Sequence, residues 1–440
     1  MVTERIEAVF AAQRSTRRAR KAEGSAERIA RLQRLRDVIV KHIPAIEQAL
    51  FEDLRRSPNG GKEGEIPAVL AEIDAAISAL DDWMSPKPVP TSPPFQGRAY
   101  VRYEPRGVVL LLGAWNFPFA LAVQPLVPIL AAGNSAMVKP NELSPATSRV
   151  VAAIIEEAFD EQDVAVFEGG VEVAERLQQL PFDHVFFTGS PAVGRLVMAA
   201  AARHLSSVTL ELGGKNPAIV APGHDLQDAA GKIVAGRFYN AGQLCLAVDH
   251  VWVHRDALED FCRLASAMVD SLFYVDGVLQ LERLPRMVNA RNLERVVGYI
   301  DDAVARGARI VRGGQVEHSN LTLHPTILAD VALDARVMQE EIFGPVLPVL
   351  AYDDLSEVVD AVDEHGKPLA VYVFAEQQAF VDEVLLGTSS GGVTLNHVFL
   401  HFMEPNLPFG GVNGSGMGRY HRYAGFLELS NARSIFELAG

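Results

Sequence analysis

Two short segments of the sequence place a thiol and a carboxylate where reactive groups are typical. Val208-Thr-Leu-Glu-Leu-Gly-Gly-Lys-Asn-Pro217 predicts a buried, β-branched strand that ends at Glu211 and two glycines. Because glycines carry no side chain, another backbone or a ligand can approach that carboxylate closely. Downstream, Asn240-Ala-Gly-Gln-Leu-Cys245 places Cys245 in a turn of small residues. A thiol and a carboxylate on loops after core segments suit covalent catalysis with a base, although a salt-bridged glutamate and a structural cysteine remain alternatives.

These groups need a framework, and the hydrophobic pattern supplies one. From residue 107 to 220, strand and helix patterns alternate, which indicates an α/β fold with a doubly wound parallel sheet. The predicted strands of this part are 108–112, 136–138, 164–167, 184–187 and 208–212, with helical segments such as 146–159 between them. Further α/β units extend to about residue 405, with predicted strands at 218–220, 250–253, 370–374 and 392–395. Ligands of such sheets bind at the carboxyl ends of the strands.

The two ends of the chain follow other patterns. Residues 1–84 have helical periodicity, and Pro44 is expected to end or kink one of those helices. Residues 85–94 are too rich in proline to be helical and lead into Ala99–Tyr103, an expected exposed strand on an arm. The glycine-rich stretch from Gly410 could pair with this arm.

Composition limits the functional classes. The 440 residues include 49% hydrophobic and 22% charged residues, as in a soluble globular protein of two or three domains. A formal charge of −15 argues against nucleic acid as a partner, and acidic neighbours make the basic run 14–21 a solvated helix face rather than a nucleic-acid patch. Two cysteines give no disulfide framework, and no apolar leader or membrane span is evident, so a cytoplasmic protein is expected.

Three turns after predicted strands carry groups that could bind a ligand. Gly189-Ser-Pro-Ala-Val-Gly194 opens a helix, where backbone N–H groups could face an anion, although it matches neither the dinucleotide fingerprint nor the P-loop. Lys139 and Glu142 could hold ribose hydroxyls, and Asn116 could donate to an oxyanion. A plain strand-to-helix turn, a surface ion pair and a turn-forming asparagine are the ordinary alternatives.

Other candidates are weaker. Cys262 shares an apolar helical stripe with Phe261 and Val269, which predicts a core position. His397 and His401 have i,i+4 spacing but lack a neighbouring acid in a metalloprotease pattern, so no metal site is predicted.

Taken together, the motifs resemble those of the aldehyde dehydrogenase superfamily along nearly the whole chain. In order they are Trp115-Asn-Phe-Pro118, Val138-Lys-Pro140 with Glu142, Phe187-Thr-Gly-Ser190 with Gly194, Glu211-Leu-Gly-Gly-Lys-Asn-Pro217, Gly242-Gln-Leu-Cys245, Glu341-Ile-Phe-Gly-Pro345 and Pro408-Phe-Gly-Gly411. The short N-terminal region, Gly391–Asn396 and Ser415–His421 resemble the class 3 and coniferyl-aldehyde dehydrogenase branch. Members of that branch often oxidise aromatic or longer aliphatic aldehydes with NAD, NADP or both.

The resemblance implies a role for each motif. Cys245 would be the nucleophile and Glu211 the general base, while Asn116 and the backbone N–H of Cys245 would donate to the oxyanion. An aldehyde would pass through a thiohemiacetal and a thioester to the carboxylic acid, with no metal. The implied cofactor-binding residues are Lys139, Glu142, Gly189, Ser190, Gly194, Glu341 and Phe343. NAD is the expected cofactor, with NADP as a possible substitute.

The resemblance also implies a division of the chain and a homodimer. The expected dinucleotide-binding domain comprises residues 1–84 and 107–213, the catalytic domain 214–409, and the β-arm for oligomerisation 85–106 and 410–440. The chain lacks the hydrophobic C-terminal tail that anchors some class 3 members, so no membrane anchor is expected.

Substrate choice and two rival functions stay open. Leu244, Val248 and His397 depart from the residues common in this branch near the substrate side. One rival is an enzyme that passes the acyl group to coenzyme A, although Glu211 favours water as the acceptor. The other is a catalytically silent binding or structural protein on the same fold, against which the retained Cys245, Glu211 and Asn116 argue.

Overall fold

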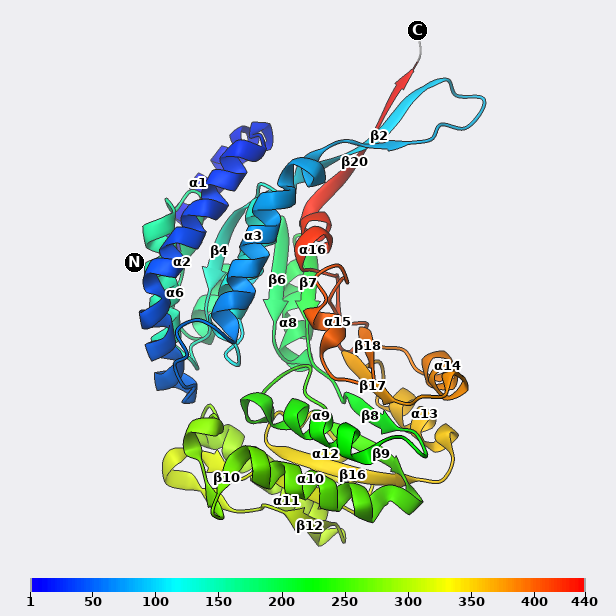
Figure 1. The fold of residues 1–440 in the computed structure, drawn as a ribbon. Helices are drawn as coiled ribbons and strands as arrows, with labels where there is room; N and C mark the ends of the chain where they lie inside the picture. The colour runs from blue at the N-terminus through cyan, green and yellow to red at the C-terminus, as the bar shows by residue number, and fades with distance from the viewer. Residues whose placement is uncertain (1, 439–440) are drawn as a thin grey trace. The chain divides into compact units, whose positions relative to one another are not determined.

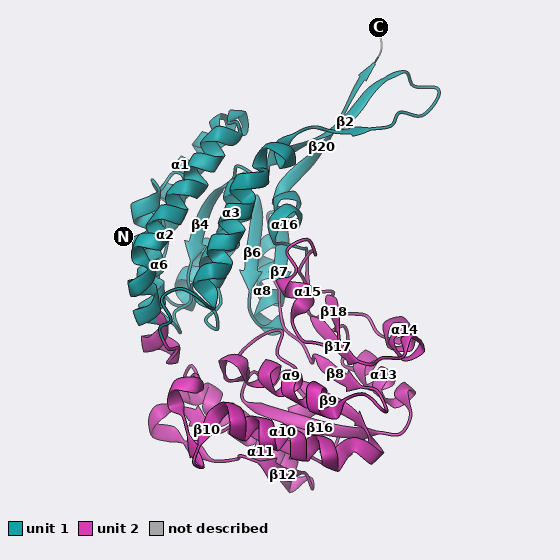
Figure 2. Ribbon diagram, in the orientation of Figure 1, with its two compact units in different colours: residues 1–49, 58–210, 418–440 teal, residues 50–57, 211–417 magenta. Residues whose placement is uncertain are grey.

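The structure is a computed structural model in which residues 2–438 are described (Figure 1). The chain divides into two compact units (Figure 2). Unit 1 comprises residues 1–49, 58–210 and 418–440, and unit 2 comprises residues 50–57 and 211–417. Each unit combines helices with a largely parallel sheet, so the predicted α/β class is confirmed.

Three helices open the chain: α1 (Val2–Ala22), α2 (Ser25–Leu54) and α3 (Glu65–Met84). The expectation that Pro44 could end a helix is wrong, because α2 continues through it. Ile39 and Ile46, on the two sides of the proline, are both fully buried. Burial of apolar residues on both sides offsets the backbone hydrogen bond that proline cannot make.

Unit 1 contains the predicted parallel strands, each within one residue of its expected ends. They are β3 (Val108–Leu112), β4 (Ser135–Lys139), β5 (Val164–Val166), β6 (His184–Thr188) and β7 (Ser207–Glu211). Along the sheet they run β7-β6-β3-β4-β5. After β3 the chain moves outward to β4 and β5, then returns to β6 on the other side of β3. This reversal is the switch point at which doubly wound sheets bind ligands.

The arm of unit 1 is an antiparallel sheet of β1 (Lys87–Val89), β2 (Gly97–Pro105) and β20 (Ser430–Leu438), in the order β1-β2-β20. The possible pairing of the C-terminal stretch with the arm is therefore confirmed, with Gly97 opposite Leu438 and Pro105 opposite Ser430. The expected exposed strand at residues 99–103 is not an unpaired edge, because β20 pairs along all of β2 and β1 covers part of its other side.

Unit 2 contains a seven-stranded sheet in the order β12-β15-β16-β9-β8-β17-β18. Its strands are β8 (Pro217–Val220), β9 (His250–His254), β12 (Arg309–Arg312), β15 (Thr326–Ala329), β16 (Val346–Tyr352), β17 (Ala370–Phe374) and β18 (Gly392–Leu395). Only β12 pairs antiparallel. The sequence did not indicate β16, because Pro348 lies inside it and proline is unusual in a central strand.

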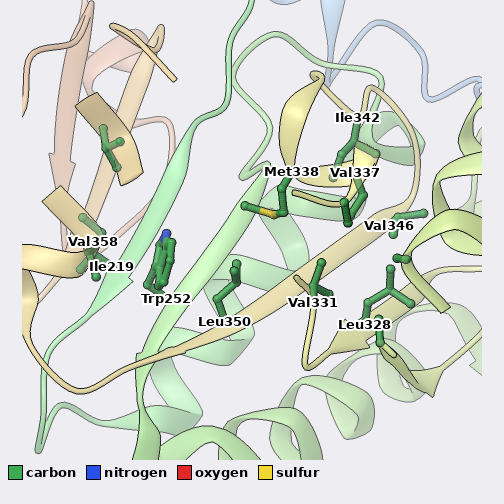
Figure 3. Packing of buried hydrophobic residues seen from close by; sticks show 14 of the residues in the cluster. Ile219, Trp252, Leu328, Val331, Val337, Met338, Ile342, Val346, Leu350 and Val358 are labelled. Carbon is green, nitrogen blue, oxygen red and sulfur yellow. The ribbon is translucent and has the colours of Figure 1, made fainter. Parts of the chain in front are cut away.

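A continuous apolar cluster fixes this sheet in place (Figure 3). Ile219, Trp252 and Leu350 are neighbours across three adjacent strands, and all are buried. Val296 of α11 (Ala290–Ala305) and Val358 of α13 (Leu355–Glu364) belong to the same cluster. The packed sheet gives the segments that flank β8 and β9 a rigid support.

The remaining helices of unit 1 are α4 (Ala120–Val123), α5 (Leu126–Ala131), α6 (Pro145–Ala158), α7 (Val171–Leu177), α8 (Pro191–Ala202) and α16 (Arg422–Glu428). Those of unit 2 are α9 (Leu226–Phe238), α10 (Leu258–Phe273), α12 (Arg336–Gln339), α14 (Gln378–Gly387) and α15 (Leu400–Met403). Short strands are β10 (Tyr274–Val275), β11 (Val278–Leu279), β13 (Val316–Glu317), β14 (Thr322–Leu323) and β19 (Gly416–Met417). Cys262 is buried on α10, as predicted. In residues 2–438 every helix is too short or too polar to cross a lipid bilayer.

Candidate active site

Cys245 follows a turn with unusual backbone geometry. Asn240, Ala241 and Gly242 have φ values of 51°, 53° and 71°, all in the left-handed region. Only the last is glycine, and a side chain there would overlap the carbonyl oxygen of Gly344. Two non-glycine residues in this region store local strain, which persists only where the surroundings enforce it.

Side chains of the turn enforce that geometry. Asn240 Nδ2 donates to the Gln243 carbonyl at 3.0 Å, and Arg56 Nε donates to Asn240 Oδ1 at 3.1 Å. Gln243 Nε2 donates to the carbonyl of Arg286 at 3.0 Å, while its Oε1 accepts from the N–H of Val288 at 3.1 Å. These bonds fasten both amides of the turn to neighbouring backbone, so the predicted glycine turn is a rigid one.

Glu211 lies at the end of β7 and is buried. The two glycines that follow it let another chain segment approach, as the sequence suggested. A side chain on Gly213 would overlap the carboxylate of Glu341, and the N–H of Gly214 donates to Glu341. The Glu211–Gly214 segment is therefore shaped to receive Glu341.

In unit 2, the predicted site residues Glu211 and Glu341 interact electrostatically with Cys245. Burial raises the pKa of the Cys245 thiol, and the carboxylates of Glu211 and Glu341 raise it further. The backbone N–H groups of Cys245 and Leu246 act in the opposite direction, because they hydrogen-bond to the thiolate. In the ligand-free protein Cys245 therefore holds its proton at neutral pH, and a base is needed to release it.

A buried ion pair joins two segments of unit 2. Residues 240–249 are called the cysteine turn, and residues 337–344 are called the Glu341 segment. Lys215 Nζ donates to Asp249 Oδ1 and to the carbonyl oxygens of Val337 and Glu340, the last two at 2.7 and 3.0 Å. Asp249 Oδ2 accepts from the N–H of Ile342 at 3.0 Å. Burial opposes both charges, yet the pKa of Asp249 is strongly lowered by Lys215, so the carboxylate stays ionised.

Two arginines complete this support. Arg237 of α9 is fully buried, and its guanidinium donates to the carbonyls of Val248, at 3.0 Å, and Gly344. Arg295 of α11 donates to the Ile342 carbonyl at 2.9 Å. Sequence reasoning assigned no role to Lys215, Asp249 or these arginines, although a charged residue in the apolar stretch of α9 is a signal of a buried partner.

Burial and the neighbouring Asp249 raise the pKa of Glu341 to about 8, against the opposing effects of the Gly214 N–H, Lys215 and Arg295. Glu341 therefore releases its proton at a much higher pH than an ordinary glutamate, and in its protonated form it can donate a hydrogen bond. Phe343, also predicted as a site residue, follows with a left-handed φ of 47°, and Arg295 reaches its carbonyl at 3.5 Å.

The other predicted residues lie in unit 1, at the carboxyl edge of its sheet. Lys139 ends β4, and its buried ammonium donates to the half-exposed Glu142 carboxylate at 2.6 Å. Asn141, between them, donates from Nδ2 to the Gly113 carbonyl at 3.2 Å, which ties the turn after β4 to the turn after β3. Asn116 is buried in the latter turn.

The turn after β6 has the shape expected from Gly189–Gly194. A side chain on Gly189 would overlap the Phe187 ring, and Ser190 caps α8 by accepting from the Val193 N–H at 3.4 Å. Thr188, the last residue of β6, buries a hydroxyl that has no hydrogen-bond partner among the described residues. The edge thus offers a capped helix N-terminus, a lysine–carboxylate pair and an unsatisfied hydroxyl.

His397 and His401 do not form a metal centre. His401 Nδ1 lies 2.7 Å from Thr394 Oγ1, and across residues 2–438 no group of three His, Cys, Asp or Glu side chains could hold a metal ion.

The model of the aldehyde dehydrogenase family matches residues 2–435. The chain belongs to the aldehyde dehydrogenase family. A Caulobacter vibrioides protein named "Probable coniferyl aldehyde dehydrogenase" is 42% identical to it over 423 residues, 93% of this chain and 86% of that one. The rat "Aldehyde dehydrogenase, dimeric NADP-preferring" is 40% identical over 428 residues, 96% of this chain and 93% of that one.

Among solved structures, the substrate-bound state of Staphylococcus aureus AldH superposes with a TM-score of 0.95 at 35% identity, covering 99% of this chain and 94% of that one. The predicted family and its class 3 branch are confirmed. This aldehyde dehydrogenase is thus an NAD(P)-dependent enzyme that oxidises aldehydes.

The raised pKa of Glu341 has a consequence for stability. Between the ordinary value of 4.5 and about 8, the folded enzyme retains a proton that the unfolded chain releases. Stability therefore falls as pH rises through this window. Glu341→Gln cannot titrate, so its melting temperature relative to the wild type should increase steadily from pH 5 to 8 in the cofactor-free enzyme.

Differential scanning fluorimetry across that pH range measures this difference. Glu357→Gln, on an exposed position of α13, is the control and should give a difference that does not change with pH. A pH-independent difference for Glu341→Gln would contradict the assignment.

Proposed function

We propose that this aldehyde dehydrogenase converts aromatic or medium- to long-chain aliphatic aldehydes to free carboxylic acids through a covalent intermediate on Cys245. The observation that carries the proposal is the coupling of the Cys245 thiol to the Glu211 and Glu341 carboxylates within unit 2. The Caulobacter relative is named for coniferyl aldehyde, an aromatic aldehyde, which supports an aromatic substrate.

In the first half-reaction the sulfur of Cys245 adds to the aldehyde carbon, and its proton passes to a base. The carbonyl oxygen becomes an alkoxide, which needs donors already in place. The Cys245 N–H is proposed as one donor and Asn116, by its motif, as the other. In the resulting thiohemiacetal the carbon is tetrahedral, and loss of hydride from it leaves a thioester on Cys245.

NAD(P), when bound, would supply the hydride acceptor in its nicotinamide ring. The residues of unit 1 fit such a cofactor. Lys139 and Glu142 offer a donor and an acceptor for two ribose hydroxyls, and the N-terminus of α8, with Gly189, Ser190 and Gly194, suits a pyrophosphate. Glu341 is proposed to bind the second ribose, with Phe343 beside it. We assign the cofactor domain to residues 1–84 and 107–213, and the catalytic domain to 214–409.

In the second half-reaction water attacks the thioester. Glu211 would accept a proton from this water, and the departing sulfur recovers its own proton as the carboxylic acid forms. Cytoplasmic location is part of the proposal, supported by a nucleophile that must remain a free thiol.

Glu211→Gln should separate the two half-reactions. Addition and hydride loss need no base for water, so the variant should form up to one equivalent of NADH per site and then stall as an acyl-enzyme. Positioned proton transfer contributes about a hundredfold to ten-thousandfold in rate, and steady-state turnover should fall by roughly that factor. Stopped-flow absorbance with an aldehyde panel measures both phases.

Cys245→Ala should show neither phase, while Cys262→Ala, in the core of α10, should retain nearly full activity. Loss of both phases in Glu211→Gln would mean that Glu211 acts earlier, on the thiol. Unchanged turnover would make Glu211 structural and direct attention to Glu341. Faster turnover of the wild type with coenzyme A would favour the acyl-transferring rival.

We also propose a preference for NAD. Glu142 accepts hydrogen bonds from ribose hydroxyls but repels a 2′-phosphate, unless the half-exposed side chain moves away. Glu142→Gln should therefore raise kcat/KM for NADP by about tenfold relative to that for NAD. Glu156→Gln, exposed on α6, is the control. A higher kcat/KM for NADP than for NAD in the wild-type enzyme would refute the proposed preference. The rat relative is named as NADP-preferring.

A homodimer formed through the arm, 85–106 and 410–440, completes the proposal. β20 is an edge strand, and Phe95, Phe436 and Leu438 are exposed apolar side chains of the arm. An exposed apolar edge invites pairing with a second copy. Light scattering at micromolar concentration should give twice the subunit mass of 47.8 kDa. A monomer would exclude the dimer.

A further inference from the structure

Three consecutive carbonyl groups of the cysteine turn are held by just two side chains. Asn216 Nδ2 donates to the carbonyl oxygen of Cys245 at 2.7 Å and to that of Ala247 at 3.1 Å. The Tyr372 hydroxyl donates to the carbonyl between them, that of Leu246, at 2.6 Å. Leu246 and Ala247 are buried, so their carbonyls need partners within the protein, and these side chains fix the direction in which the carbonyls point.

The two side chains are themselves rigidly placed. Asn216 is fully buried just before β8, and its Oδ1 accepts from the Ala370 N–H at 2.9 Å. Tyr372 is fully buried in β17, the strand that pairs with β8, and lies opposite Ala218. Both donors therefore come from the sheet core and not from the turn that they hold.

Fixing a carbonyl also fixes the N–H of the next residue. In a trans peptide the C=O and N–H groups point in opposite directions. Because the Cys245 carbonyl faces Asn216, the N–H of Leu246 points away from Asn216. Tyr372 holds the Leu246 carbonyl, and the same peptide contains the Ala247 N–H. That N–H donates to the Leu244 carbonyl at 3.0 Å. The Leu244 carbonyl belongs to the peptide that contains the Cys245 N–H, so this N–H is fixed as well. These are the two N–H groups that act on the Cys245 sulfur.

We propose that Asn216 and Tyr372 are positioning residues of the reaction: by holding these carbonyls, they keep the N–H groups of Cys245 and Leu246 directed at the sulfur and at the oxyanion formed beside it. The inference rests on the proposed role of Cys245 as nucleophile. Beyond that role, it assigns to the Tyr372 hydroxyl and the Asn216 side-chain amide the orientation of two backbone N–H donors, those of Cys245 and Leu246.

The charged groups around the thiol allow a clear readout. The carboxylates of Glu211 and Glu341 both act on Cys245. Tyr372 keeps its proton, because burial and the nearby Cys245 raise its pKa far above the ordinary value. His401, whose ring centre lies 6.1 Å from that of Tyr372, is neutral, since burial lowers its pKa to about 4. Neither ring changes charge between pH 6 and 9, whereas Glu341, with a pKa of about 8, does, so every variant is compared with the background enzyme over the same pH range.

Tyr372→Phe removes a single oxygen and tests the proposal in the cofactor-free enzyme. In a Cys262→Ala background Cys245 is the one thiol, and its alkylation by iodoacetamide is followed against pH. The midpoint is the pH at which the alkylation rate reaches half of its maximum. Weakened N–H donation destabilises the thiolate, so this midpoint should move upward by about half a pH unit to one pH unit. In steady state kcat should fall by about tenfold to a hundredfold with KM little changed.

Tyr352→Phe is the matched control. Its hydroxyl is also buried in the sheet of unit 2 and donates to a carbonyl, that of Val220, at 2.8 Å. It should leave both the midpoint and kcat at the wild-type values. Asn216→Ser, which cannot span two carbonyls, should shift the midpoint further than Tyr372→Phe and provides a second variant if the first folds poorly.

A wild-type midpoint in both Tyr372→Phe and Asn216→Ser would overturn the proposal, as would an equal shift in Tyr352→Phe, which would indicate general loosening. Failure of the proposed function looks different. Alkylation of Cys245 in the background enzyme would then leave aldehyde oxidation intact, whatever the midpoints of the variants.

Discussion

The Lys215–Asp249 ion pair is the interaction on which the arrangement of unit 2 depends. It lies where the segment after β7, the end of the cysteine turn and the Glu341 segment meet. Removing two charges from water costs several kcal/mol, and the attraction between them offsets this only when further hydrogen bonds complete the site. Here the carbonyls of Val337 and Glu340 and the N–H of Ile342 provide those bonds. The pair therefore specifies one arrangement of three segments, because any other would leave a buried charge unpaired.

The same logic explains the strained turn before Cys245. A left-handed Asn240 and Ala241 are unfavourable alone, yet the Arg237 guanidinium and the side chains of Asn240 and Gln243 hold this region against neighbouring backbone. The strain and the polar network are two aspects of one design. Polar groups of a buried network define its geometry more narrowly than apolar packing does, because hydrogen bonds have preferred directions.

Much of the fold was predictable, and the reasons are local. Strands such as β3 and β17 are continuous apolar runs with β-branched residues, which is a strong signal for buried parallel strands. The sequence singles out Glu211 and Cys245 as candidates because small residues surround a potentially reactive group. By contrast, β16 was obscured by Pro348, and β1 was not predicted as a partner of β2, because residues 85–94 have the composition of a proline-rich lead into the arm. Lys215, Arg237 and Tyr372 could not be assigned, since their roles depend on carbonyls whose direction no sequence pattern reveals.

The division of the chain has a consequence for synthesis. Unit 1 begins at the N-terminus but is completed only by residues 418–438, whereas unit 2 is almost entirely the intervening segment 211–417. On the ribosome, β2 waits for its full-length partner β20 until all of unit 2 has been made. β2 ends at Pro105 and β20 begins at Ser430, so at about 5–20 residues per second this delay is roughly fifteen to sixty-five seconds. During that time the inner strand of the arm is an open edge, so the nascent chain is most vulnerable to aggregation at the segment that later forms its arm.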